Sequence, residues 1–407
     1  MADVLVLGAG MVGIGTALAL QTQGHAVRVL DRRGPGEETS HGNAGVIQAE
    51  ARAPYAMPRD LATLIRYALG RSNDLRLSPG ALPGAALPLL AYFRHSSPGR
   101  MTKVIPHYAA IISRATQDHG QLIAEADAEV LIRRTGLGEI FDDPAAFEAR
   151  CESAQDMAEA HGLDLRLMTG QELRVAEPAL TSTPAGAVVW ADSWSATDPS
   201  ALVRAYARLF VSRGGALLSG DIGRLEEART GWRVRCAQTA HAADHVVVAL
   251  GPWSPALVKP LGYRVPMILK RGYHGHFEMQ GSLTRPYVLD QHGVVLSSMA
   301  RGLRITTGAH LARPSSPRNL AQLTHGAEAA GRLVDLKGPV ANSQWHGVRP
   351  CLPRMLPMVG RAPRHRGLWF NFGHGHQGFT LGPTTGALLA EILDGRDDAL
   401  TRALSPA

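Results

Sequence analysis

Two apolar runs, separated by a glycine-rich turn and a helical segment, open this chain and constrain its fold more than any other feature. Residues 4–7 are apolar and stop at Gly8, and residues 26–30 are apolar and stop at Asp31. The residues between them have the spacing of a helix that ends near Gly24, because glycine often follows a helix C-terminus. Strand, glycine turn, helix, strand and acid in this order predict a nucleotide-binding βαβ unit.

Each glycine of the turn meets a different steric requirement of dinucleotide binding. Gly8 permits the tight turn, Gly10 lets the backbone approach a pyrophosphate, and Gly13 lets the helix pack on the strands. The helix N-terminus offers N–H groups and the positive end of its dipole to the phosphates. Asp31 is placed to accept hydrogen bonds from ribose hydroxyls. The alternative is a glycine-rich turn in an ordinary doubly wound sheet.

The fingerprint alone does not distinguish FAD from NAD. Asp31 would repel the 2′-phosphate of NADP, although the neighbouring Arg32 and Arg33 would attract it. The cofactor contacts expected in this region come from the turn, the start of the helix and the acid: Gly8, Gly10, Met11, Val12, Gly13, Asp31 and Arg32.

Length and composition indicate a globular protein of about two domains. The chain has 407 residues, 45% of them hydrophobic and 19% charged. No long uncharged apolar window predicts a transmembrane helix, and the N-terminus enters the first strand without a basic signal-peptide region. The three cysteines, Cys151, Cys236 and Cys351, are too far apart for a disulfide framework or a zinc pattern. We therefore expect a cytoplasmic protein.

The net charge of +7 comes from scattered arginines rather than from a basic cluster. No long basic run is interleaved with aromatic residues, so nucleic-acid binding is not expected. A positive field favours an anionic small-molecule substrate instead.

The rest of the chain predicts a mixed architecture. Residues 51–106 have the composition of surface helices and loops, residues 107–163 have helical spacing, and Asp198 introduces a helix over residues 200–212. Short apolar runs at hairpin-like spacing predict an antiparallel block, and their residues are 265–268, 273–278, 294–297 and 303–307. A last helix is expected over residues 384–393. The fold class is thus α/β plus α+β.

Two later glycine motifs match the second half of a flavin site. The apolar run at residues 246–250 ends at Gly251, which is typical of a strand that ends over a nucleotide. Residues 372–385, FGHGHQGFTLGPTT, combine closely spaced glycines with the start of the last helix. The glycines let the backbone approach a flat ligand, and the helix N-terminus can face the polar edge of a flavin.

Taken together, the motifs resemble the FAD-dependent amino-acid and amine oxidoreductases of the D-amino-acid oxidase superfamily. The resemblance spans nearly the whole chain and favours FAD over NAD. It rests on GAGMVGIGTA from Gly8, TSHGNAG at residues 39–45, RGYH at 271–274, GLRITTG at 302–308, GVRP at 347–350 and GHGHQGFTLGP at 373–383.

The resemblance implies a Rossmann-like FAD-binding domain interleaved with a substrate domain built on a mainly antiparallel sheet with helices. The FAD-binding domain would comprise residues 1–55, 162–256 and 340–407. The substrate-binding domain would comprise residues 56–161 and 257–339.

The resemblance also implies roles for individual residues. Arg349 of GVRP would bind the substrate carboxylate with its planar guanidinium, unless it forms a structural ion pair. Tyr273, His274 and His41 would line the substrate pocket, although Tyr273 and His274 could equally pack within a strand. The further flavin contacts would be Ser40, Asn43, Ala44, Gly45, Ile222, Gly251, Gly375, His376, Gly378, Phe379 and Thr380, with backbone N–H groups of residues 43–45 beside the flavin.

Some positions depart from the family pattern. His41 stands where D-amino-acid dehydrogenases usually have an aromatic residue. Arg304 stands near the position of the oxygen-activating lysine of monomeric sarcosine oxidase, which leaves the electron acceptor open among oxygen, a quinone and a protein. Cys351 does not match the cysteine that holds FAD covalently in some relatives, so noncovalent FAD is expected. The HxH pairs at residues 274–276 and 374–376 lack the accompanying ligands of a metal site, and no metal is expected.

The expected activity is oxidation of the amine of a carboxylate-bearing substrate to an imine, by hydride transfer to flavin N5. A D-amino acid or a cyclic secondary amino acid such as D-hydroxyproline is the favoured substrate. The alternative is a secondary amine of the N-substituted glycine or glyphosate type. An NAD-linked dehydrogenase and a noncatalytic FAD-binding subunit are more remote alternatives. Stereochemistry, oligomeric state and any association with a membrane surface or partner subunit stay open.

Overall fold

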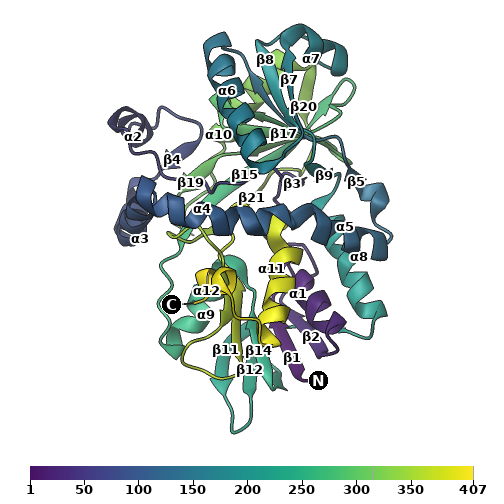
Figure 1. Cartoon of the computed structure of the whole chain (residues 1–407), viewed down its shortest axis with the longest axis vertical. Helices are drawn as coiled ribbons and strands as arrows, with labels where there is room; N and C mark the ends of the chain where they lie inside the picture. The colour runs from purple at the N-terminus through teal and green to yellow at the C-terminus, as the bar shows by residue number, and fades with distance from the viewer. Residues whose placement is uncertain (314, 407) are drawn as a thin grey trace.

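The computed structural model describes residues 1–313 and 315–406 and consists of two halves, each built on its own main sheet (Figure 1). The lower half in Figure 1 contains a six-stranded sheet in the order β10-β2-β1-β14-β23-β22. Its strands are parallel except for β22, which pairs antiparallel with β23. They span Asp3–Leu7 (β1), Ala26–Asp31 (β2), Ala216–Ser219 (β10), His245–Val248 (β14), Met358–Arg361 (β22) and Leu368–Phe372 (β23).

Two helices from opposite ends of the chain pack on this sheet. Helix α1 (Met11–Thr22) follows the glycine turn, and α11 (Gly378–Leu393) is the long helix near the C-terminus. Glycines let their backbones approach closely, because a Cβ on Gly15 would lie 2.8 Å from the Gly382 carbonyl oxygen. The N-terminal βαβ unit and the C-terminal glycine motif are therefore brought together in one layer.

A three-stranded antiparallel sheet covers the other face of the six-stranded sheet. It comprises β11 (Ile222–Glu227), β12 (Trp232–Cys236) and β13 (Ala240–Ala243). Trp232 and Val234 of β12 are fully buried against Leu5 and Leu7 of β1 in one apolar cluster. The parallel sheet is thus buried on both faces, as parallel sheets usually are.

The upper half in Figure 1 is built on an eleven-stranded sheet that is mostly antiparallel. Its central strand, β15, pairs with β18, β19, β20 and β21. The strands span Leu75–Leu77 (β4), Leu137–Phe141 (β6), Leu165–Thr169 (β7), Gly186–Trp190 (β8), Ile268–Met279 (β15), Tyr287–Leu289 (β16), Val294–Met299 (β17), Gly302–Thr307 (β18), Ala309–Leu311 (β19), Leu336–Pro339 (β20) and Trp345–Cys351 (β21).

Helices and a small sheet complete the two halves. Helices α4 and α5 run across the middle of the molecule, and α2 and α3 lie at one side (Figure 1). The small sheet has the order β3-β9-β5. The bounds are Val46–Ile47 (β3), Ile132–Arg133 (β5), Trp194–Ala196 (β9), Leu61–Ala68 (α2), Leu82–His95 (α3), Pro98–Ser113 (α4), Ala115–Glu125 (α5), Pro144–His161 (α6), Gly170–Ala176 (α7), Pro199–Ser212 (α8), Ser254–Val258 (α9), Ala321–Leu333 (α10) and Ala399–Leu404 (α12).

The predicted fold class is confirmed, and several elements agree closely with the sequence patterns. The expected helix at residues 200–212 is α8, and the Asp198 carboxylate accepts a hydrogen bond from the Ala201 N–H at 3.0 Å, as an N-cap should. Two elements differ. The strand predicted at residues 265–268 begins only at Ile268 and continues without a break into the next one. The last helix begins at Gly378 rather than residue 384 and continues through Pro383, which cannot donate to the Phe379 carbonyl oxygen; His119 Nε2 lies 3.0 Å from that oxygen instead.

Three strands belong to the other half of the molecule from the one expected for their residue ranges. β7, β8 and β21 lie in the eleven-stranded sheet, although residues 162–256 and 340–407 were expected in the FAD-binding domain. β7 pairs with β8 over its whole length, and β21 pairs with β15 from Ile268 to His274. These pairings are long-range, so no local signal in the sequence indicates them.

Candidate functional site

A single cavity of about 900 Å³ extends from the glycine turn of the six-stranded sheet to β15 and β21 of the large sheet. Its volume is that of a large ligand or of a ligand pair. Of the residues expected to bind cofactor or substrate, sixteen line this cavity: Gly8, Gly10, Met11, Val12, Asp31, Arg32, Ser40, Asn43, Ala44, Ile222, Gly251, Arg349, Gly375, His376, Gly378 and Phe379.

The glycine turn forms one end of the cavity, and neighbouring backbone atoms leave no space there for a Cβ atom at Gly8 or Gly13. Gly8 has φ of +112°, and a Cβ there would lie 2.5 Å from the Ala249 carbonyl oxygen. A Cβ on Gly13 would lie 1.8 Å from the Gly8 carbonyl oxygen, so Gly13 packs the turn and does not line the cavity. Gly8 and Gly13 thus have the steric roles predicted for them, and Gly10 lines the cavity at the start of α1.

Asp31 lies at the end of β2 beside this turn. One carboxylate oxygen accepts a hydrogen bond from the Ala9 N–H at 2.7 Å, and the other accepts one from the Arg33 N–H at 2.8 Å. Burial raises the pKa of Asp31, and the two backbone hydrogen bonds oppose that shift. The carboxylate is thereby held at the cavity wall, where a ribose would meet it.

Arg32 is occupied by other groups. Its guanidinium donates to the Glu38 carboxylate at 2.6 Å and lies 4.4 Å from the centroid of the Trp253 ring. An arginine that is already ion-paired is a poor ligand for a 2′-phosphate. This arrangement favours a dinucleotide without that phosphate.

Residues 40–45 form the wall next to α1. The Met11 N–H donates to Ser40 Oγ at 3.0 Å, which joins the segment to the helix N-terminus. Buried Arg304 donates to the carbonyl oxygens of His41 at 3.0 Å and Asn43 at 2.6 Å, and burial lowers the pKa of Arg304 to about 10. Arg304 therefore holds the shape of this segment and is not at the cavity surface.

Gly45 differs from its expected role. Its N–H donates to the Asn43 side-chain oxygen at 2.8 Å, and its carbonyl accepts from the Ala196 N–H at 2.7 Å. It does not line the cavity, because its positive φ of 80° turns the chain against β9. The neighbouring Ala44 does line it. The expected flavin contact thus falls on residues 43 and 44 rather than on Gly45.

The C-terminal glycine motif supplies the opposite wall. Gly375, His376, Gly378 and Phe379 line the cavity, so the N-terminus of α11 opens toward it. Thr380 does not, because its hydroxyl donates to the Val46 carbonyl oxygen at 3.3 Å and packs α11 against β3. A helix N-terminus at this place favours negative charge on a bound group.

The residues around this part of the cavity fit FAD. A glycine turn without Cβ atoms, an acid at the end of β2 and the N-termini of α1 and α11 all face one elongated cavity. Asp31, Gly10 and the start of α1 would hold the adenosine and pyrophosphate, and residues 43–44 with 375–379 would surround the flavin ring. FAD bound there supplies the two-electron acceptor of an oxidation.

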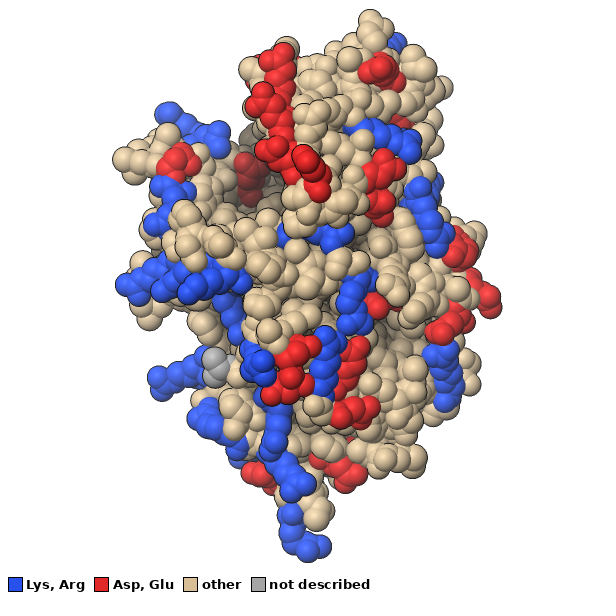
Figure 2. Space-filling model, viewed as in Figure 1, with Lys and Arg blue, Asp and Glu red and all other residues tan. Residues whose placement is uncertain are grey.

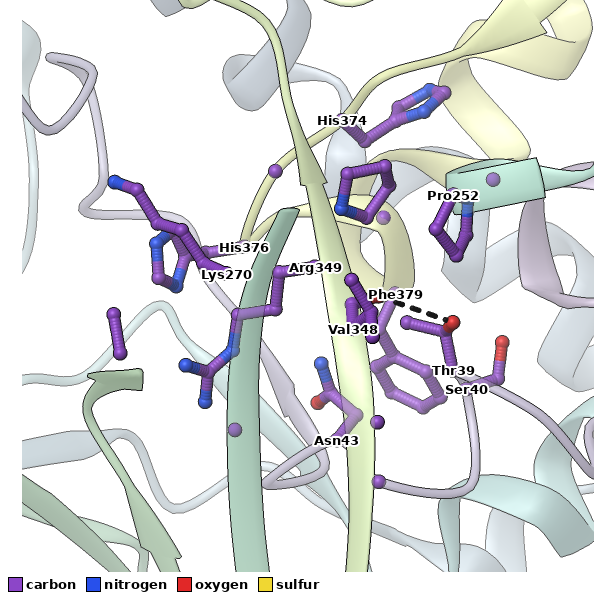
Figure 3. A pocket seen from close by; sticks show the side chains of 18 of the residues that line it. Thr39, Ser40, Asn43, Pro252, Lys270, Val348, Arg349, His374, His376 and Phe379 are labelled. Carbon is purple, nitrogen blue, oxygen red and sulfur yellow. Dashed lines mark hydrogen bonds between the residues drawn. The ribbon is translucent and has the colours of Figure 1, made fainter. Parts of the chain in front are cut away.

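Arg349 lies at the other end, on β21. Its two terminal nitrogens donate to the carbonyl oxygens of Gly308 at 2.7 Å and Thr307 at 2.8 Å. Gly272 makes room for it, because a Cβ there would lie 2.7 Å from the Arg349 Cζ. Figure 3 shows the guanidinium at the left of β15 and Phe379 at the right of β21, with Asn43 between the two in this view. Arg349 retains further N–H donors that can bind a carboxylate.

Tyr273 and His274 do not line the cavity, contrary to prediction. Side chains alternate along a strand, so Tyr273 points away from the face of β15 that carries Gly272. Its hydroxyl lies 2.9 Å from His310 Nδ1. His274 lies on the same face as Gly272 but is covered by Trp345, whose ring stacks on it with centroids 5.4 Å apart. Both residues belong to the packing of the large sheet.

His41 is also outside the cavity lining. Its Nδ1 lies 2.9 Å from Ser200 Oγ, and its ring lies edge-on to Trp345. Burial, and then the charge of Arg304, lowers the pKa of His41. The predicted polar pocket of His41, Tyr273 and His274 is therefore not formed.

Several residues that line the cavity lie outside the motifs expected to bind cofactor or substrate. The most informative is Lys270, which is the register partner of Arg349. Trp345 and Tyr92 also line it, with apolar residues from α2, β4 and α3. The only sequence signal for Lys270 is its position directly before RGYH, and that signal does not reveal which face of the strand it occupies.

No group of three or more His, Cys, Asp or Glu side chains in residues 1–313 and 315–406 is arranged to hold a metal ion. In the same residues, no helix has both the length and the apolarity required to cross a bilayer.

Comparisons with known proteins agree with this geometry. A family model described as FAD dependent oxidoreductase (DAO) matches residues 3–392. The D-amino acid dehydrogenase of Chromohalobacter salexigens is 30% identical over 412 residues, covering 98% of this chain and 97% of that protein. The D-amino acid dehydrogenase of Paramagnetospirillum magneticum is 32% identical, covering 98% and 96%. Glycine oxidase from Bacillus cereus has the same fold, with a TM-score of 0.71 at 19% identity, covering 100% of this chain and 99% of that one.

Proposed function

Since the chain belongs to the family of FAD-dependent oxidoreductases, we propose that it oxidises the amine of an amino acid whose carboxylate is bound by Arg349. The family resemblance predicted from the motifs is confirmed. The observation that carries the proposal is that Arg349 shares one cavity with the glycine turn, Asp31 and the N-terminus of α11. One continuous cavity therefore connects Arg349, which can bind a carboxylate, with the wall that can bind a nucleotide.

Arg349 would position the substrate through charge-assisted hydrogen bonds. Its guanidinium is held in place by the Gly308 and Thr307 carbonyl oxygens, so little side-chain freedom is left to lose on binding. Binding energy at the carboxylate then orients the α-carbon toward the neighbouring flavin site, and orientation supplies a large part of such a rate enhancement. The positive charge of Arg349 also disfavours the ammonium form of the bound amine, and the neutral amine is the reactive form.

The substrate class we propose is a D-amino acid, because both full-length relatives named above are D-amino acid dehydrogenases. A secondary amine of the N-substituted glycine type is the second candidate, since the same carboxylate contact would serve it. The expectation of D-hydroxyproline depended on polar side chains at His41, Tyr273 and His274. Because none of the three lines the cavity, these side chains do not support a preference for a hydroxylated ring.

We propose that FAD is held without a covalent bond. Cys351 is buried, burial raises the pKa of its thiol, and it is not among the residues that line the main cavity. A buried thiol that stays protonated is a poor nucleophile for flavin attachment. Precipitation of the protein with acid should release all of the yellow colour into the supernatant.

We also propose that α2 and α3 form a surface that binds anionic membranes. Apolar side chains point outward on both helices, with Leu61 71% exposed and Leu87 79% exposed. Basic residues surround them, and Figure 2 shows Lys and Arg gathered on the side where Figure 1 places these helices. The apolar and basic residues of this surface are Leu61, Ile65, Leu69, Leu87, Leu90, Arg59, Arg66, Arg71, Arg94, Arg100 and Lys103.

Vesicle sedimentation tests this surface. The protein should bind vesicles that contain phosphatidylglycerol, lose binding in high salt, and not bind pure phosphatidylcholine vesicles. Leu61→Ser combined with Leu87→Ser should abolish the binding. If the wild type ignores anionic vesicles, or if the double variant binds them equally well, the proposed surface is wrong.

The proposed reaction is tested by anaerobic reduction of the purified flavoprotein. The protein should show the visible spectrum of bound flavin, and that absorbance should bleach on addition of D-amino acids but not of the corresponding α-hydroxy acids. D-amino acids, L-amino acids, cyclic imino acids and N-alkyl glycines form the panel. A colourless protein, or a flavin that no amine of the panel bleaches, would contradict the proposal.

A further inference from the structure

A second cation stands beside Arg349 in the cavity. Lys270 on β15 is directly opposite Arg349 on β21 in the antiparallel register, so the two side chains leave the sheet on the same face. Both line the cavity. Figure 3 shows the Lys270 amine and the Arg349 guanidinium on the same side of these strands, with His376 next to Lys270.

Neither cation is neutralised by a carboxylate of the described residues. Arg349 donates to backbone carbonyl oxygens, and the Lys270 Nζ lies 4.8 Å from the centroid of the Tyr92 ring, a cation–π contact with a neutral group. The carboxylates that line the same cavity belong to other stretches of its wall, at Asp31, Glu38 and Asp221 in the nucleotide-binding half and at Asp74 and Asp290 near β4 and β17. Among the described residues, no ion pair of 4.0 Å or less involves either cation.

The titratable groups closest to the two cations are uncharged at neutral pH. Burial, and then the charges of Arg349 and Lys270, holds the pKa of His376 well below its usual value. Burial raises the pKa of the Cys351 thiol, although both cations oppose this shift. The two positive charges at this end of the cavity therefore have no carboxylate of the described residues within ion-pair distance. Partly buried charges are normally paired, so a pair of them without a counter-charge indicates an anionic ligand.

One carboxylate on Arg349 leaves Lys270 without a partner. We propose that the substrate carries a second anionic group, a carboxylate or a phosphonate, and that Lys270 binds it. The inference rests on the proposed amine oxidation and names the class of its substrate: amino acids with two anionic groups. Lys270 is then a specificity-determining residue, and Leu77, Leu89 and Leu311, which pack in one cluster with Tyr92, add apolar surface to the same cavity.

The first experiment measures binding without turnover. Isothermal titration of the FAD-loaded protein compares glutarate, which has two carboxylates, with its monoamide glutaramate, which has one. The wild type should bind glutarate roughly 10- to 100-fold more tightly, as expected for a charge-assisted hydrogen bond in a partly buried site. Lys270→Met should reduce this ratio to about 1 by weakening glutarate binding alone. Lys270→Arg should keep most of the ratio.

Controls separate the specific effect from a general one. Lys337→Met removes an exposed lysine on β20 and should leave both affinities unchanged. The flavin content of each variant is measured by absorbance, because a role of Lys270 in holding FAD would lower flavin content and weaken both ligands equally. A wild type with no preference for glutarate, or a Lys270→Met variant that weakens both ligands by the same factor, would overturn the proposal.

The second experiment compares reacting substrates. Anaerobic flavin reduction by D-glutamate should saturate at lower concentration than reduction by D-glutamine, and Lys270→Met should abolish the difference. Tight glutarate binding together with no reduction by any amino acid would contradict the proposed reaction and leave the anion site intact. Reduction by neutral amino acids with no preference for the second anion would overturn the anion site and leave the reaction intact.

Discussion

At the nucleotide end of the cavity the backbone itself sets the shape, whereas at the end that holds Arg349 and Lys270 the shape comes from side chains on paired strands. A Cβ at Gly8 or Gly13 would overlap backbone atoms, so those positions tolerate no side chain. By contrast, Arg349 and Lys270 are adjacent only because β21 pairs with β15 in one register. The first end is therefore specified by several short continuous motifs, and the second by the pairing of two distant strands.

This difference means that the two ends should respond differently to substitution. Changes at the nucleotide end should affect folding and cofactor retention together, because the same glycines that admit the cofactor also pack α1 on the sheet. Changes at the other end should affect which ligand binds while the fold persists. The predictions below test that separation, beginning with the largest expected effect.

The largest effect is expected for Gly13→Ala. Its Cβ would lie 1.8 Å from the Gly8 carbonyl oxygen, a backbone atom that cannot move without opening the turn. We expect a loss of more than about 3 kcal/mol in the free energy of unfolding, with little flavin retained. Thermal unfolding and the ratio of flavin to protein absorbance measure both effects.

Gly331→Ala is the matched control. It lies within α10, and a Cβ there would have no neighbour within 4 Å. Alanine should stabilise that helix slightly, by about 0.5–1 kcal/mol. If Gly13→Ala purified with full flavin and an unchanged unfolding temperature, the steric account of the nucleotide end would be wrong.

The same contrast explains how much of the molecule could be predicted from its sequence. The βαβ unit, helix α8 with its Asp198 cap and the antiparallel strands β17 and β18 have local patterns, and they were found where expected. Helix α11 begins six residues before the expected start, because the glycines and the proline of its first turns are residues typical of a loop. The packing of α11 against α1, which the sequence does not show, favours a helix there.

The candidate site shows the same limit. Contacts in continuous motifs, such as Gly10, Asp31 and Phe379, line the cavity as expected. Tyr273, His274 and Lys270 lie on one strand, and which of them reaches the cavity depends on strand alternation and on the position of Trp345. The motif therefore indicates which strand borders the substrate site, but not which of its side chains line the cavity.

An intermediate effect is expected when the pH is lowered. The free energy of unfolding should decrease, because histidines are buried in the large sheet and beside α11. Burial lowers the pKa of His274 to about 2 and that of His374 to about 3. In the unfolded chain both titrate near 6.5, so below that pH the unfolded state binds protons that the folded state does not. The free energy of unfolding should therefore fall as the pH decreases from 7 to 5, by up to about 1.4 kcal/mol per pH unit for each such histidine.

Denaturant unfolding at pH 7, 6 and 5 measures this slope. His274→Phe keeps an aromatic ring against Trp345 and removes one protonation site, so its slope should be shallower than that of the wild type. His161→Phe, at an exposed position at the end of α6, should leave the slope unchanged. A wild-type free energy that is constant over this range would contradict the burial of neutral histidines.

The smallest effect is expected for Tyr273→Phe. The Tyr273 hydroxyl pairs with His310 on the face of β15 away from the cavity, so its loss should cost about 1 kcal/mol of stability. The substrate concentration that half-reduces the flavin should change by less than about threefold. A change of more than tenfold would place Tyr273 in the substrate site and contradict the lining described above.

The central claim is that one cavity holds FAD at the nucleotide end and an amino-acid carboxylate at Arg349. The most direct test compares Asp31→Ala with Arg349→Ala. For both variants, one measures how much flavin is retained after gel filtration and how anaerobic flavin reduction depends on substrate concentration. FAD is added back to a variant that has lost it before the reduction is measured. The account predicts that Asp31→Ala loses flavin but keeps its substrate affinity within about threefold. Arg349→Ala should keep its flavin and need well over tenfold more substrate, since the lost contact is worth about 1.5–3 kcal/mol, and Arg349→Lys should recover part of the affinity. Full flavin retention in Asp31→Ala, or unchanged reduction in Arg349→Ala, would contradict it.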